Sequence, residues 1–381
     1  DLVLMRAGEN TFPASTAFVA FLHGDPVSDV ERINYSPALE QLIVETLDGN
    51  DRIYLDDNWT DTIVRGGTGT DSFQVGQMYK TERDFLNANV ALEDEFETTA
   101  TTRGFLSNGT SFHTELDGGD GEDRFSVYHN TAPLDLLGGT GTDSFVLRKF
   151  ALVGGGYVSN AAVSFLDGDA DEKLAVFGTE EEDTFVINDT EILGCGQTIN
   201  YALLGTIQVD AAEGDDSFHA LALRDDTTVG LFGGLGNDTF HIGGDAGAVF
   251  IETGTLAPQA GPHDLNTILG LLVLNGGSNP EINVMALAEP VMLPGETNEL
   301  ASSGMVLDFT GSGAGGALDS MTVNSADLQA VLPGLGLSEL DDLIGATLEI
   351  SSGGGTGRFW QIYSLLEDPL SEQILHGRLK A

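Results

Sequence analysis

The stretch Leu116–Leu147, LDGGDGEDRFSVYHNTAPLDLLGGTGTDSFVL, decides how the chain folds. It holds two copies of the nine-residue pattern G-G-x-G-x-D-x-U-x, where U is a large apolar residue, beginning at Gly118 and at Gly138. In each copy an aspartate stands two residues before a phenylalanine, and equivalent residues are 20 positions apart. A fixed period in this range is typical of a solenoid, in which each repeat forms one coil and stacks on the next.

The same pattern recurs on both sides of this stretch. It begins again at Gly66 and Gly233, and alternating apolar residues such as Phe125 and Val127 predict strands that are buried on one face. We therefore expect an all-β fold, a parallel β-roll or β-helix solenoid with coils of about 20 residues. The phenylalanines that follow the aspartates should stack as one interior ladder formed by Phe73, Phe125, Phe145, Phe185, Phe218 and Phe240.

Departures from the period divide the chain. We expect lead-in strands over 1–40, a β-solenoid over 41–250 with excursions near 77–113 and 189–202, a degenerate coil or linker over 251–289, and a smaller mixed, β-rich C-terminal module over 290–381.

The C-terminal module is mixed in this interpretation because two kinds of local pattern occur in it. Ser325–Leu332 and Ser338–Gly345 resemble short helices, the second with a capping box from Ser338 to Asp341. The segments ATLEIS and RFWQIYSL, on either side of a glycine-rich turn, predict a hairpin.

Charge and cysteine content limit the function classes. The 381-residue chain has 60 acidic and 15 basic residues, a net charge of −45, so nucleic acid and anionic membranes are unsuitable partners and cations are suitable ones. The single cysteine, Cys195, forms no intrachain disulfide, and no apolar run predicts a membrane span or signal peptide. This balance fits a calcium-rich extracellular setting, although a halophilic cytoplasm would give the same balance.

The aspartate-rich turns suit calcium. This ion takes six to eight oxygen ligands, which carboxylates and the carbonyl groups of glycine-rich turns supply. One turn cannot surround an ion, whereas two stacked turns can. An alternative is that the aspartates only cap turns through Asx-type hydrogen bonds. The expected calcium ligands are the pairs Asp51 with Asp71, Asp123 with Asp143 and Asp216 with Asp238, and secondarily Asp48, Asp117, Asp120 and Asp215.

The motifs GGTGTDSFQ, GGDGEDRFS, GGTGTDSFV and GGLGNDTFH resemble RTX, or haemolysin-type, calcium-binding repeats. The run from about Leu42 to Gly244 further resembles repeat units of very large bacterial secreted or cell-surface proteins. The resemblance implies a parallel β-roll whose turns hold Ca²⁺, and secretion. This chain has one motif per coil where the simple pattern has two, so calcium would line one edge only. It leaves unassigned the opposite edge, with Asp56, Asp57, Asp225 and Asp226.

These observations favour a non-enzymatic, calcium-stabilised structural protein outside the cell or on its surface. It would act as a spacer, an adhesin segment or a filament subunit, with copies of itself joined end to end and surface polysaccharide as a further partner. One alternative is a β-helix protein that binds or modifies polysaccharide, although the 15 basic residues are spread thinly for an acidic substrate. Another is a secretion and folding device for a neighbouring domain.

Overall fold

The computed structural model describes residues 2–8, 16–23, 29–80, 82–83, 95–166, 172–261 and 265–276, and towards the C-terminus residues 308–310, 320–324, 347–349, 359–367 and 372–380. The chain divides into two compact units, Asp1–Pro280 and Glu281–Ala381. Within the described residues all regular secondary structure is strand and no helix occurs. The all-β class predicted from the sequence is therefore confirmed.

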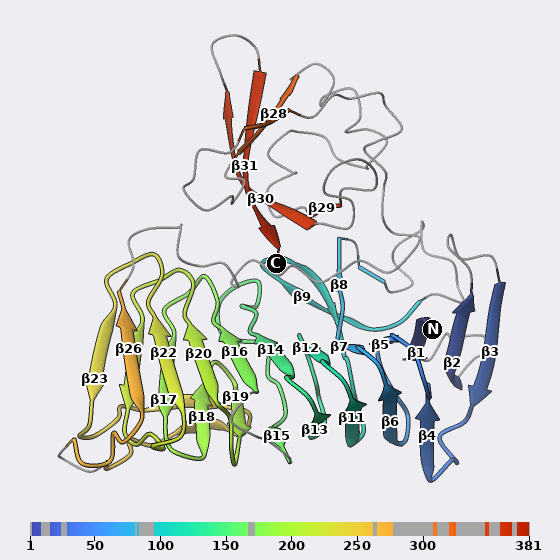
Figure 1. Cartoon of the computed structure of the whole chain (residues 1–381), viewed down its shortest axis with the longest axis horizontal. Helices are drawn as coiled ribbons and strands as arrows, with labels where there is room; N and C mark the ends of the chain where they lie inside the picture. Colours follow the sequence, from blue (N-terminus) through green and yellow to red (C-terminus); the bar gives the residue numbers. More distant parts are fainter. Residues whose placement is uncertain are drawn as a thin grey trace. The chain divides into compact units, whose positions relative to one another are not determined.

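Two long sheets build the first unit (Figure 1). The first sheet has eleven strands, in the spatial order β26 (Leu271–Asn275), β22 (Thr228–Phe232), β20 (Thr206–Asp210), β16 (Lys173–Phe177), β14 (Ser144–Arg148), β12 (Arg124–Val127), β7 (Ser72–Val75), β5 (Arg52–Leu55), β1 (Leu2–Gly8), β2 (Thr16–His23) and β3 (Asp29–Tyr35).

The second sheet has ten strands. Their spatial order is β23 (Thr239–Ile242), β21 (Ser217–Ala220), β17 (Thr184–Ile187), β18 (Glu191–Gly194), β19 (Gln197–Asn200), β15 (Val163–Phe165), β13 (Leu134–Thr140), β11 (Thr114–Asp120), β6 (Asp61–Thr68) and β4 (Gln41–Glu45).

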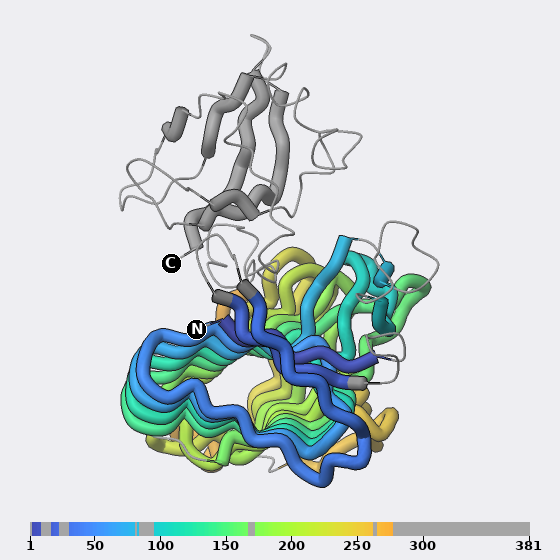
Figure 2. Tube along the Cα trace, turned by 90° about the vertical axis from the view of Figure 1, so that its right-hand side faces the viewer, coloured from blue at the N-terminus to red at the C-terminus, as the bar shows by residue number. Residues whose placement is uncertain are grey.

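The chain passes alternately from one sheet to the other, so that it winds in a solenoid-like stack. Figure 2 shows the successive coils lying over one another. From β4 to β14 the parallel register joins residues 20 apart, as in Ile43 with Ile63 and Phe125 with Phe145, except where an insertion lengthens the coil. From β20 to β22 the offset is 22 residues. We call residues 41–275 the coiled region.

The predicted insertions differ in how they relate to the coil. The segment expected near 77–113 forms a separate three-stranded sheet of β8 (Met78–Tyr79), β10 (Gly104–Ser107) and β9 (Thr98–Thr101). The segment near 189–202 does not leave the coil, because β18 and β19 form a hairpin whose two strands lie within the second sheet, between β17 and β15. Hydrogen bonding to both neighbours gives the hairpin backbone the partners it would lack outside the sheet.

The ends of the coiled region also continue its sheets. At the N-terminus β1 pairs in parallel with β5, and β2 and β3 add antiparallel strands to it. Beyond β23 the chain forms the hairpin β24 (Val249–Ile251) and β25 (Gly254–Leu256), and then β26, which pairs in parallel with β22.

The second unit contains a five-stranded antiparallel sheet. Its spatial order is β27 (Asp308–Thr310), β28 (Ser320–Asn324), β31 (Glu372–Lys380), β30 (Phe359–Glu367) and β29 (Thr347–Glu349). The pairing of β29 with β30 corresponds to the hairpin expected from the sequence. The two segments expected to form helices, Ser325–Leu332 and Ser338–Gly345, lie outside the described residues.

Stacked phenylalanines fill the interior of the coiled region, but in two ladders where the sequence predicted one. Phe73, Phe125 and Phe145 stack in the first sheet with ring centroids 4.7 and 4.8 Å apart. Phe185, Phe218 and Phe240 stack in the second sheet at 5.8 and 5.0 Å. The division arises because the aspartate-rich turns of the two halves lead into different sheets.

Replacing Phe125 with Ala should lower the free energy of unfolding by about 3–5 kcal/mol, because the ring is 1% exposed and stacks on both sides. Chemical denaturation followed by circular dichroism measures the change. The matched control is Arg124→Ala in the same strand, whose exposed side chain should cost less than about 0.5 kcal/mol. Equal effects of the two substitutions would contradict the ladder's role in stability.

Candidate metal centre

The first four expected ligands form a ladder along one edge of the coiled region. We call Asp51, Asp71, Asp123 and Asp143 the first ladder. The backbone N–H of each donates to the Oδ1 atom of the next, at 2.8 Å from Asp51 to Asp71, 2.7 Å from Asp71 to Asp123 and 2.7 Å from Asp123 to Asp143. All four side chains are buried. The excursion between β7 and β11 does not interrupt the ladder, since Asp71 and Asp123 are 52 residues apart in sequence.

A second ladder of the same construction contains Asp183, Asp216 and Asp238. The N–H of Asp183 donates to Oδ1 of Asp216 at 2.7 Å, and that of Asp216 to Oδ1 of Asp238 at 3.2 Å. Asp183 was not among the expected ligands, because the β18–β19 hairpin lengthens its spacing to Asp216 to 33 residues. A signal was present in the sequence, since Asp183 stands two residues before a phenylalanine, as do five of the six paired aspartates.

The two ladders lie on different edges, so the expectation of one common edge is wrong. The turns of the first ladder lead from the second sheet to the first, for example from β11 to β12. The turns of the second ladder lead from the first sheet to the second, as from β22 to β23. Because all coils wind in the same direction, these two kinds of turn lie on opposite edges. The aspartate-rich turn therefore changes edge within the coils that precede β17.

In several ladder aspartates, one carboxylate oxygen takes no part in these hydrogen bonds. The Oδ2 atoms of Asp71, Asp123, Asp216 and Asp238 are buried and have no hydrogen-bond partner. Those of Asp71, Asp123 and Asp238 lie over the first glycine of their own motif, whereas Ala211 occupies that position in the repeat of Asp216. A Cβ added to Gly118 would fall closer than 3.0 Å to Oδ2 of Asp123 and to the carbonyl oxygen of Gly138 in the next coil. A residue with a side chain would not fit at this position. Because glycine has none, the carboxylate oxygen and the carbonyl oxygen can both lie close to its Cα atom.

This arrangement fits a hard cation in its donor chemistry. Buried anionic oxygens without donors are costly, and a cation that takes carboxylate and carbonyl oxygens would remove the cost. The same convergence occurs at Gly66, where the Oδ2 atom of Asp71 meets the carbonyl oxygen of Gly118. Within the described residues no three His, Cys, Asp or Glu side chains gather closely enough to hold an ion. Backbone carbonyls and water would therefore have to supply most ligands.

The secondary candidates occupy exposed positions in or beside these turns and make hydrogen bonds to the next coil. Oδ1 of Asp48 accepts from the Thr68 hydroxyl at 2.8 Å, and Oδ1 of Asp120 from the Thr140 hydroxyl at 2.8 Å. Oδ1 of Asp215 accepts from the backbone N–H of Asn237 at 2.9 Å. A fourth, Asp117, is half-buried, with Oδ2 4.0 Å from Arg65 Nε. These contacts match the turn-capping alternative better than a buried ion site.

Burial and mutual repulsion disfavour the charged form of the ladder aspartates. Burial, together with the charges of Asp71, Asp143 and Asp117, raises the pKa of Asp123 to about 6. Burial and three neighbouring aspartates raise the pKa of Asp216 to about 8. The pKa values of Asp71 and Asp238 are raised for the same first cause. Near neutral pH the ladders therefore carry repulsion that a bound cation would relieve.

The aspartates left unassigned by the resemblance have protein partners. Asp56 is buried and receives hydrogen bonds from Arg6 Nε at 2.9 Å and Nη2 at 2.7 Å, and from the Tyr79 hydroxyl at 2.9 Å. Asp57 accepts from the Asn58 N–H at 2.8 Å and from Asn108 Nδ2 at 3.0 Å. These carboxylates join the N-terminal strand and the excursion to the coil.

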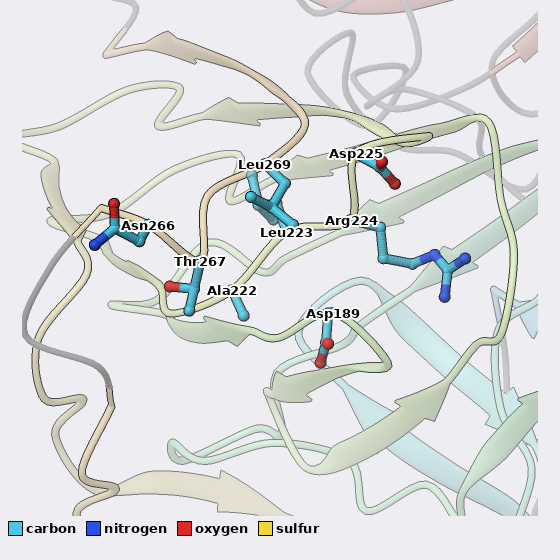
Figure 3. A pocket seen from close by; sticks show the side chains of 8 residues that line it. All are labelled: Asp189, Ala222, Leu223, Arg224, Asp225, Asn266, Thr267 and Leu269. Atoms are coloured by element: carbon cyan, nitrogen blue, oxygen red, sulfur yellow. The ribbon is translucent and has the colours of Figure 1, made fainter.

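A pocket of about 300 Å³ lies beside the turn that follows β21. In Figure 3 its polar side chains are spread out, with Asn266 at one end and Arg224 at the other. The Arg224 guanidinium donates to both carboxylate oxygens of Asp226, at 2.9 Å each. The labelled polar side chains of this pocket therefore do not converge on one point. Its lining residues are Asp189, Ala222, Leu223, Arg224, Asp225, Asn266, Thr267 and Leu269.

Comparison with known proteins gives no relative from which a function could be transferred. No protein-family model matches the chain, no curated protein is similar to it, and no solved structure matches it. In the described part of the chain, no helix is long and apolar enough to cross a membrane.

Replacing Gly118 with Ala should destabilise the coiled region by about 1–3 kcal/mol, because the new methyl group meets Oδ2 of Asp123 and a backbone carbonyl. Thermal unfolding measures the effect. Gly247→Ala is the control, since a Cβ there has nothing within 4 Å and its backbone is not left-handed. If Gly118→Ala were as well tolerated as the control, the close packing of aspartate on glycine would be wrong.

In the absence of divalent cations, stability should fall as the pH rises. The pKa values of Asp123 and Asp216 are raised in the folded state, so the contribution of these groups is fully present below their usual pKa of 3.8. It is lost as the pH passes about 6 for Asp123 and about 8 for Asp216. Urea denaturation in EDTA across this range measures the trend. Asp123→Asn should reduce the step near pH 6, to which Asp57 and Asp183 also contribute, and should leave the later step unchanged. A step near pH 6 of undiminished size would show that Asp123 does not contribute to it.

Proposed function

We propose that the chain is a calcium-stabilised structural protein of the cell surface or extracellular space, mechanical rather than catalytic in its role. One observation supports this most strongly. The Oδ2 atoms of Asp71 and Asp123 are buried without donors, each beside a glycine carbonyl of the next coil. In this proposal each coil of about 20 residues is one unit of a β-roll, and its aspartate-rich turn shares an ion with its neighbour.

Calcium suits these sites better than other common divalent cations. Every available donor is a carboxylate, carbonyl or water oxygen, which excludes the nitrogen and sulfur ligands preferred by zinc. Calcium accepts six to eight such oxygens in irregular geometry, whereas magnesium requires a compact octahedron and keeps several waters. The repeated turns offer carboxylate and carbonyl oxygens without a fixed octahedral arrangement, which suits calcium.

Binding would offset the charge of the chain. With 60 acidic residues against 15 basic ones, self-repulsion opposes folding, and the two ladders place aspartates next to one another. Extracellular calcium modules bind with dissociation constants of about 10⁻⁴–10⁻³ M. An ion present at about ten times its dissociation constant stabilises the folded state by about 1.4 kcal/mol per site. Several sites together would equal the stability of a typical domain.

A spacer, adhesin segment or filament subunit is the mechanical role we assign. The edge strands β26 and β4 are parallel to their neighbours, so each can accept a further coil in the same direction, and both carry exposed apolar side chains. At its other edge the first sheet ends in the antiparallel strand β3. Leu271 and Val273 are exposed on β26, the last strand of the first sheet, and Ile43 is exposed on β4, the last strand of the second. End-to-end addition of copies would cover these residues.

Calcium should raise the unfolding temperature of the full chain, and EDTA should lower it. The discriminating variant is Asp123→Asn, which can still accept the hydrogen bond from the Asp71 N–H at Oδ1 but loses the negative charge and an anionic oxygen. We expect this variant to lose part of the calcium-induced shift. Glu122→Gln, an equal change of charge at an exposed residue in the same turn, should retain the full shift.

If the unfolding temperature of the parent chain did not change with calcium, the proposal would be wrong. The aspartates would then only cap turns. An equal loss of the shift in both variants would also count against it, because bulk charge would then account for the effect. Light scattering on the same samples reports end-to-end association, which calcium should promote.

A further inference from the structure

A lysine lies buried where the aspartate-rich turn changes edge. Lys149 directly follows β14 and is 2% exposed, and its backbone N–H donates to the Phe177 carbonyl at 2.9 Å. Lysine is almost never fully buried unless it has a partner. Neither the interior packing nor the aspartate ladders account for an amine at this position.

The partner is the side chain of Gln197, 48 residues further along. Lys149 Nζ contacts Gln197 Oε1, and Gln197 is 1% exposed. The amide is held in one orientation, because its Nε2 atom donates to Asn130 Oδ1 at 2.9 Å and to the Ala161 carbonyl at 2.7 Å. The amine thus lies next to the carbonyl group of a fixed, water-excluded carboxamide.

The hairpin that carries Gln197 is itself held in place. Gln197 is the first residue of β19, directly after the turn residues Cys195 and Gly196, which both have positive φ. The N–H of Gly196 donates to the Phe250 carbonyl at 3.0 Å, and the Gly196 carbonyl accepts from Asn160 at 3.2 Å. These backbone hydrogen bonds fix the turn, and the turn places Gln197 beside Lys149.

The electrostatic surroundings favour a reactive amine. Burial lowers the pKa of Lys149 to about 7, and the neighbouring acidic groups Glu252 and Asp183 oppose this shift only in part. A large share of the amine is then neutral near physiological pH, and a neutral amine is the nucleophilic form. Asp183 is not available as a cation ligand here, since its oxygens accept from the Thr179 N–H at 2.6 Å and hydroxyl at 3.0 Å.

We propose that Lys149 and Gln197 form an intramolecular isopeptide bond. The Nζ lone pair attacks Cδ of Gln197, a new Nζ–Cδ amide bond forms, and the Cδ–Nε2 bond breaks. The departing nitrogen takes up the proton that Nζ loses and leaves as ammonia. No oxidant, reductant or further reactant is consumed. Holding the two groups in contact supplies the effective concentration that makes such a reaction feasible.

The bond would staple the coiled region at its least regular point. It would join the end of β14 to β19, across the place where the hairpin enters the second sheet and where the first ladder gives way to the second. A crosslink that closes a 48-residue loop restricts the unfolded chain. In a chain with one cysteine this is a covalent alternative to a disulfide.

Intact-mass spectrometry of the denatured full chain tests the proposal directly. The measured mass should be lower than the sequence mass by one ammonia molecule, and proteolysis should yield a branched peptide that contains both Lys149 and Gln197. An unmodified mass would overturn the proposal and leave a hydrogen bond only. Loss of ammonia located at any other pair of residues would also overturn it.

Variants separate this bond from a thioester between Cys195 and Gln197, which would release the same ammonia. Cys195→Ser should keep the mass loss, whereas Lys149→Met and Gln197→Met should each abolish it. Lys173→Met, at an exposed lysine on β16, is the matched control and should keep it. If Cys195→Ser abolished the loss and Lys149→Met did not, the thioester would replace our proposal.

Discussion

The hydrogen bond from the backbone of one aspartate to the side chain of the next is the interaction on which the coiled region depends. It uses one carboxylate oxygen to set the register between neighbouring coils, as in the 2.7 Å bond from Asp123 to Asp143. A backbone donor that would otherwise be buried without a partner is thereby satisfied. The second carboxylate oxygen, such as Oδ2 of Asp123, accepts no hydrogen bond, and this makes the same residue a candidate cation ligand.

The glycines of the motif follow from that one bond. The first glycine leaves space for the aspartate oxygen, as Gly118 does for Asp123. The glycine at the fourth position serves a different need. Gly69 has φ of 139°, and a Cβ on it would overlap the carbonyl oxygen of Gly49 in the preceding coil. Conformational entropy is lost at each glycine, so the repeat must recover stability from stacked aromatic rings and, in our proposal, from bound ions.

Local repetition was enough to predict the strands, the aspartate pairs and the phenylalanine stacking, because each depends on residues one coil apart. Features that depend on residues further apart could not be predicted from the local repeat. The spacing from Asp183 to Asp216 gave no period, since a hairpin inside the sheet separates them. The change of edge was hidden for the same reason. Which sheet a turn leaves depends on how many strands precede it, and an aspartate two residues before a phenylalanine occurs on both edges.

The hairpin β18–β19 interrupts the stack of parallel strands, and neither aspartate ladder joins the coils on its two sides along one edge. The strand β18 is antiparallel to both neighbours, and in this part of the chain the first ladder ends at Asp143 and the second begins at Asp183, on the opposite edge. Buried side chains have to hold this boundary, and Asn130, Lys149 and Gln197 meet there in one hydrogen-bonded group. In the mechanical role that we propose, the stack would be weakest where its repeat is broken. A covalent bond is most useful there, and the geometry favours one at that point.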